Sequence, residues 1–99
     1  MLNHDNQEMC WELLSKNGCS AQRQMVIEEC AELQKATCKL NRFPCPLMEE
    51  NFKEELVDVL VVIQEMMLDM EMDMDEVNKR ANRKLNRALG QWEWTEAKK

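Results

Sequence analysis

Glu54-Glu55-Leu56-Val57-Asp58-Val59-Leu60-Val61-Val62-Ile63 is the stretch that decides the fold. Its β-branched residues would also suit a buried strand. Helix-forming residues flank it on both sides, however, and no turn signal bounds it, so the pattern favours a helix. Asp58 is the only polar residue between Leu56 and Ile63. A lone carboxylate in apolar surroundings is costly unless something compensates its charge, which makes Asp58 a candidate functional residue.

On either side of this stretch, turn signals divide the rest of the chain into further helices. Asn17-Gly18 is typical of a helix end, and Phe43-Pro44-Cys45-Pro46 interrupts any helix that reaches it. Ser20 is a suitable N-cap, and Asp73 with Glu76 three residues later resembles a capping pair. The expected helices run from Asp5 to Lys16, from Ser20 to Arg42, from Leu47 to Met70, and from Asp73 to Gly90.

These elements predict one all-α domain over residues 1–99, a bundle of four helices. The first helix is short, and the second and third are long and antiparallel because their connection is short and broken by prolines. The third helix is apolar nearly all round between Leu56 and Met70, so it needs neighbours on more than one side. A chain of 99 residues supplies few of them. We therefore expect a homo-oligomer, either a homodimer or a homotetramer, to complete the bundle.

Composition narrows the possible functions. The net charge of −6 argues against non-specific nucleic-acid binding. No signal peptide is visible, and the apolar run is far shorter than a membrane span, so a membrane partner is not expected. Five cysteines with no CxxC spacing and a single histidine do not suit a structural zinc site. Free thiols in a reducing cytoplasm are the simplest interpretation.

Two acidic motifs on separate helices are the main candidate site. Glu29 and Glu32 lie three residues apart, as do Glu55 and Asp58, so each pair shares a helix face. Facing helices would gather four carboxylates, which cannot all stay ionised together without cations. Oxygen ligands favour Mg²⁺, and Mn²⁺ would substitute. Glu65 lies near the face of Asp58, but a solvated side chain is the expected state there.

Basic and bulky residues near the C-terminus are the other candidates. Lys84 shares a stripe with Val77, Ala81 and Ala88, so it is expected to point towards the bundle, where it would neutralise phosphate charge. The competing interpretation is a basic cluster favoured by the helix dipole. The methionines from Met66 to Met74 are expected in the core or a subunit interface. Trp92 and Trp94 are expected to cover the end of the bundle.

The acidic motifs resemble a known family. Glu29-x-x-Glu32 followed by Glu55-x-x-Asp58 is similar to the ExxE…ExxD signature of the MazG-like all-α nucleoside triphosphate pyrophosphohydrolases. Asn82-Arg83-Lys84, followed by Arg87, resembles the basic segment of that family. The resemblance covers roughly residues 20 to 90.

The resemblance implies magnesium-dependent hydrolysis of a nucleoside triphosphate to the monophosphate and pyrophosphate in an oligomeric helical domain. Metal ligands would be Glu29, Glu32, Glu55 and Asp58, and phosphate or sugar contacts would come from Asn82, Lys84 and Arg87. A carboxylate not fully used in coordination, either Glu28 or Glu29, would take a proton from the attacking water. The alternative from another class is a non-catalytic helical module that binds metal or a basic partner.

Overall fold

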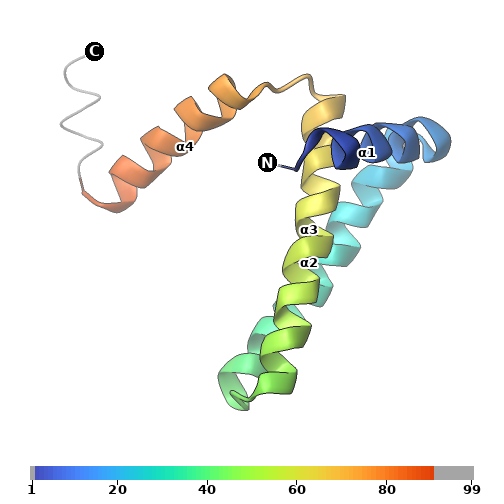
Figure 1. The fold of residues 1–99 in the computed structure, drawn as a ribbon. Coiled ribbons are helices and arrows are strands. Elements are labelled where there is room, and N and C mark those ends of the chain that lie inside the picture. The colour runs from blue at the N-terminus through green and yellow to red at the C-terminus, as the bar shows by residue number, and fades with distance from the viewer. Residues whose placement is uncertain (1, 91–99) are drawn as a thin grey trace.

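The computed structural model describes residues 2–90, which form four helices and no strand (Figure 1). The all-α prediction is therefore confirmed for this part of the chain, and the predicted helix boundaries hold to within about two residues. Trp92 and Trp94 lie outside the described residues. The helices are α1 (His4–Asn17), α2 (Cys19–Arg42), α3 (Pro46–Asp69) and α4 (Met74–Ala88).

The helix starts follow local capping chemistry at three of four positions. Asn3 caps α1 by accepting a hydrogen bond from the Asn6 backbone N–H at 2.9 Å. Pro46 opens α3, where its missing N–H costs nothing. The prediction that Ser20 caps α2 is wrong, because the cap is Gly18 at φ +89°, which makes no side-chain bond. Glycine tolerates this conformation and allows α1 to turn directly into α2.

The core is formed by α2 and α3, which lie side by side, with α1 packed across them (Figure 1). Their connection spans only residues 43–45, which makes the two long helices antiparallel neighbours as predicted. The buried apolar residues are Cys10 and Leu14 on α1, Ala36 on α2, and Val59, Val62 and Met67 on α3.

The fourth helix stands apart from this core. No Cα atom of α4 lies within 8 Å of a Cα in α1, α2 or α3, and none of its residues is buried. Figure 1 shows it leaving the end of α3 and extending away from the other helices. The radius of gyration is 16.6 Å, whereas a compact domain of this size measures about 12 Å. Within the single chain, the bundle therefore consists of three helices.

The turn after α3 determines the direction in which α4 leaves. The Met72 N–H donates to the Met67 carbonyl at 2.9 Å, and the Glu71 N–H donates to the Leu68 carbonyl at 3.2 Å. These are the two bonds of a Schellman motif, with Glu71 in the left-handed position at φ +54°. A non-glycine residue there is under strain of about 1–2 kcal/mol. The motif closes α3 and turns the chain before α4 begins.

Within residues 2–90, no helix combines the length and the apolar character that a bilayer-crossing segment requires.

Candidate metal centre

Three carboxylates from two helices converge at the α2–α3 contact. One ligand oxygen from each of Glu29, Glu55 and Asp58 lies within 4.8 Å of the other two. Glu29 comes from the middle of α2, while Glu55 and Asp58 share a face of α3 because they are three residues apart. The short connection between the helices brings these positions to the same level. Three of the four predicted ligands are therefore together.

The environment of this cluster opposes the ionisation of Glu29. Its pKa is raised above the ordinary value of 4.5, first by desolvation and then by the negative charges of Asp58, Glu55, Glu32 and Glu28. A second unfavourable feature lies at Glu55. Its Oε2 is buried and has no hydrogen-bond partner among the described residues. A buried carboxylate oxygen without a donor is costly. Both observations fit a bound hard cation, which would supply positive charge and a ligand position for that oxygen.

The other two candidates on α2 lie outside this group. Glu28 and Glu32 are exposed, and they act on Glu29 through their charge rather than by sharing its ligand position. Asp58 is also exposed in the single chain, although its neighbours in sequence are apolar. The apolar surroundings expected for Asp58 do not enclose it, because Leu56 and Val57 on the same stretch are themselves 44% and 53% exposed.

A further carboxylate on α3, that of Glu65, differs from its prediction. Glu65 is fully buried, with 0% of its surface exposed, so the expectation of a solvated side chain is wrong. The Gln22 Nε2 donates to both carboxylate oxygens, at 3.0 and 3.1 Å. Gln22 Oε1 in turn accepts from Asn17 Nδ2 at 3.1 Å. Glu65 lies three residues after Val62, which is buried on the same face of α3, but its polar partner Gln22 is far away in the sequence.

The predicted phosphate-binding residues do not reach the Glu29–Glu55–Asp58 cluster of their own chain. Asn82, Lys84 and Arg87 are exposed and lie on α4, which contacts none of the other helices. The expectation that Lys84 points towards the bundle is therefore wrong in the single chain. Asn82 is held within α4, because Asn86 Nδ2 donates to its Oδ1 and its carbonyl, both at 2.9 Å.

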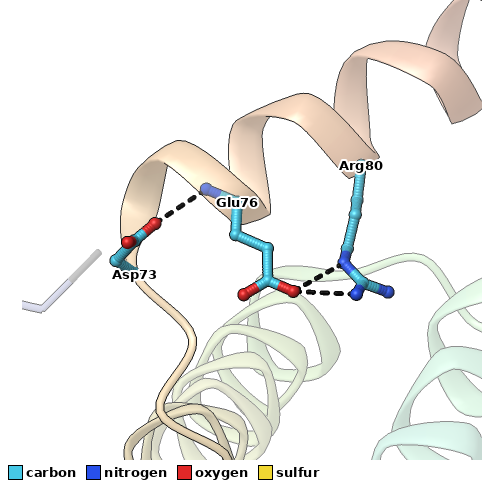
Figure 2. A network of polar contacts seen from close by, with 3 residues as sticks. All are labelled: Asp73, Glu76 and Arg80. Carbon is cyan, nitrogen blue, oxygen red and sulfur yellow. Dashed lines mark hydrogen bonds and ion pairs between the residues drawn. The ribbon is translucent and has the colours of Figure 1, made fainter.

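Local contacts order the start of α4. Figure 2 shows the Asp73 carboxylate accepting from the Glu76 N–H at 2.9 Å, which confirms Asp73 as the N-cap. The Glu76 side chain does not reach back to complete a capping box. It accepts instead from Arg80 Nη2 at 2.7 Å and Nε at 3.1 Å. These bonds are internal to α4 and help it persist without tertiary contacts.

The arrangement supplies an all-oxygen cluster that bears excess negative charge and opens to solvent at Asp58. Such a cluster can hold a divalent cation and present it to a phosphorylated ligand. No family model, no curated protein and no solved structure matches this chain. The resemblance to the MazG-like family thus stays a prediction.

Proposed function

We propose that this protein is a magnesium-dependent nucleoside triphosphate pyrophosphohydrolase of the MazG-like kind. The observation that carries the proposal is the convergence of Glu29 with Glu55 and Asp58 from a separate helix. The buried, unpaired Glu55 Oε2 is the second support, because it is a polar atom that a cation would satisfy.

In this proposal Glu29, Glu55 and Asp58 would hold the metal, and Glu32 would be a further ligand. A bound magnesium ion would neutralise phosphate charge and lower the pKa of an attacking water. The exposed edge at Asp58 leaves an open side for the triphosphate. The reaction is the hydrolysis of the α–β phosphoanhydride.

A carboxylate at the rim takes the proton from that water. Glu28 suits this role because it is exposed beside Glu29 and is not one of the three converging ligands. Glu29 is the other candidate, because its carboxylate lies within the converging cluster itself. Comparing Glu28→Gln and Glu29→Gln separates them, because only the ligand variant should also weaken metal binding.

The decisive experiment measures pyrophosphate release from a panel of ribo- and deoxyribonucleoside triphosphates, with Mg²⁺, with Mn²⁺ and with EDTA. Glu55→Gln and Asp58→Asn should lower turnover by at least about 100-fold while the helical content stays unchanged. Glu54→Gln is the matched control, because Glu54 adjoins Glu55 but lies exposed and outside the cluster. Equal turnover in Glu55→Gln and the control would contradict the site.

The competing function is a non-catalytic module that binds metal or a basic partner through the same carboxylates. It predicts a metal-dependent rise in melting temperature without hydrolysis of any nucleotide. We further propose that the protein is a homo-oligomer, because α3 leaves Leu56, Val57 and Ile63 exposed. All five cysteines are free, which supports our proposal of a cytoplasmic location.

A further inference from the structure

A buried polar contact joins α2 to α3. Gln22 and Glu65 are both buried, and the Gln22 Nε2 donates to both carboxylate oxygens, at 3.0 and 3.1 Å. Asn17, the last residue of α1, donates through its Nδ2 to the Gln22 Oε1 at 3.1 Å. On the same helix, burial and then the negative charge of Glu65 raise the pKa of the Cys10 thiol. The contact is therefore shielded from water and connects three helices.

Stability alone does not explain this contact. A carboxylate removed from water is costly, and one amide group satisfies only part of its hydrogen-bonding capacity. Two apolar side chains of the same shape would serve the packing of α2 on α3 as well or better. The best-attested use of a buried polar group between helices is to fix their register, because only one alignment satisfies both partners.

The polar contact has a fixed relation to the carboxylate cluster of Glu29, Glu55 and Asp58. Glu29 follows Gln22 by seven residues on α2, and Asp58 precedes Glu65 by seven residues on α3. Because the helices are antiparallel, both steps run in the same direction along their contact. Seven residues make about two turns, so the polar pair and the cluster involve the same helix faces, about 10.5 Å apart along the helices.

Apolar packing alone would not hold this alignment as firmly. Hydrophobic contacts are non-directional, and α3 has apolar residues around most of its surface, so a slide by one turn would exchange one apolar neighbour for another. Such a slide moves Glu29 by about 5.4 Å along α3. That is more than the 4.8 Å within which the three ligand oxygens lie. It would also leave the Glu65 carboxylate buried without its donor.

The connection at residues 43–45 is the other constraint on the register. It follows Arg42, which lies thirteen residues after Glu29, whereas Gln22 lies seven residues before it. The carboxylate cluster therefore lies between two constraints, and the buried polar pair is the nearer one.

We propose that Gln22 and Glu65 are positioning residues for the metal centre, because their buried hydrogen bonds fix the register of α2 against α3 on which the carboxylate cluster depends. The inference rests on the proposed function, since it requires the cation site. It adds two residues that lie outside the ExxE…ExxD signature and outside the cluster itself. They act through the alignment of the helices and not by touching the metal.

Replacing both partners at once tests this role without leaving a buried polar group unpaired. Gln22→Met with Glu65→Met keeps two unbranched side chains but removes the hydrogen bonds. In EDTA this variant should be as helical as the wild type and melt at the same or a higher temperature. Its dissociation constant for Mn²⁺, measured from the EPR signal of the free ion, should rise at least about tenfold. Binding of Mn²⁺ as tight as in the wild type would overturn the proposal.

Two conservative variants separate the hydrogen bond from the charge of Glu65. Glu65→Gln removes the charge but still accepts from the Gln22 amide. The exchanged pair, Gln22→Glu with Glu65→Gln, keeps an amide against a carboxylate with the two ends reversed. Both should bind Mn²⁺ as the wild type does. Loss of affinity in either one would overturn the proposal, even if the methionine pair did not fold.

The wild type separates this inference from the proposed function. If it binds no Mn²⁺, the carboxylate site is wrong and the positioning role is wrong with it. If it binds Mn²⁺ and the methionine pair binds the ion equally well, only the positioning role is wrong.

Discussion

The α2–α3 pair and helix α4 show that a helical pattern predicts which face will be buried but not what will bury it. The α3 helix has apolar residues around most of its surface, and five of its residues are buried in the single chain. The α4 helix has a narrow stripe and a fully polar opposite face, yet none of its residues is buried. The better-segregated pattern therefore belongs to the helix without a partner in its own chain.

The largest contrast in stability should come from two methionines. Met67 on α3 is buried, whereas Met74 on α4 is 44% exposed. We expect Met67→Ala to lower the free energy of unfolding by about 2–4 kcal/mol, because it leaves a cavity. Met74→Ala should cost less than about 0.5 kcal/mol in dilute protein. Urea unfolding at low micromolar concentration measures both, and equal losses would contradict the separation of α4 from the core.

The next contrast compares a buried polar contact with an exposed one. Gln22→Ala removes the hydrogen-bond donor observed at the buried Glu65 carboxylate, at a cost of about 1.5–3 kcal/mol. Arg80→Ala removes the Glu76 ion pair on α4, whose side chains are 55% and 41% exposed. That loss should be about 0.3–0.5 kcal/mol. Thermal unfolding of both variants measures the two losses of stability. A larger loss for Arg80→Ala than for Gln22→Ala would contradict the expected order.

The N-caps of α1 and α4 allow the packed helices and α4 to be compared through a smaller effect on stability. Asn3 caps α1, which packs on the core, and Asp73 caps α4, which does not; each side chain accepts one backbone N–H at 2.9 Å. Each substitution by alanine should cost its helix about 1 kcal/mol. Asn3→Ala should lower the global melting temperature, while Asp73→Ala should only speed amide hydrogen exchange in the first turn of α4. A global loss in Asp73→Ala would indicate that α4 is coupled to the core.

The smallest effect concerns pH. The raised pKa of Glu29 means that the folded chain holds this proton more tightly than the unfolded chain. Its contribution to stability is therefore full below about pH 4.5 and is lost as the pH rises through the raised value. In EDTA, Glu29→Gln should be slightly more stable than wild type at pH 7 and no more stable at pH 4.

Melting curves at both pH values, with and without Mg²⁺, check this sign. Magnesium should reverse the order at pH 7 by stabilising only the wild type. A variant that gains from magnesium as much as the wild type would argue against Glu29 as a ligand.

Sequence reasoning located the helices and three of the four proposed metal ligands, since these follow from short-range rules. The two prolines near residue 45 determine where the long helices turn, and the helical repeat determines that Glu55 and Asp58 share a face. The burial of Glu65 depends instead on Gln22, 43 positions earlier, whose amide reaches it across the helix contact. A local sequence pattern cannot indicate a contact between residues 43 positions apart.

The position of α4 was missed for a related reason. Its stripe predicts burial, and a bundle of four helices within one chain is the simplest way to provide it. The direction of α4 depends instead on the backbone of Glu71, a residue whose side chain gives no sign of a left-handed conformation. The conformation of this turn therefore could not be predicted from the apolar stripe of α4.

The short connection at residues 43–45 has a consequence for how the protein folds. Because it joins the two longest helices directly, pairing them closes only a short loop, and helical bundles of this kind fold in a phase of microseconds to milliseconds. This phase should have the same rate at every protein concentration. Burial of α4 against a second copy of the chain would require two molecules to meet, so it should follow as a slower phase whose rate rises with concentration.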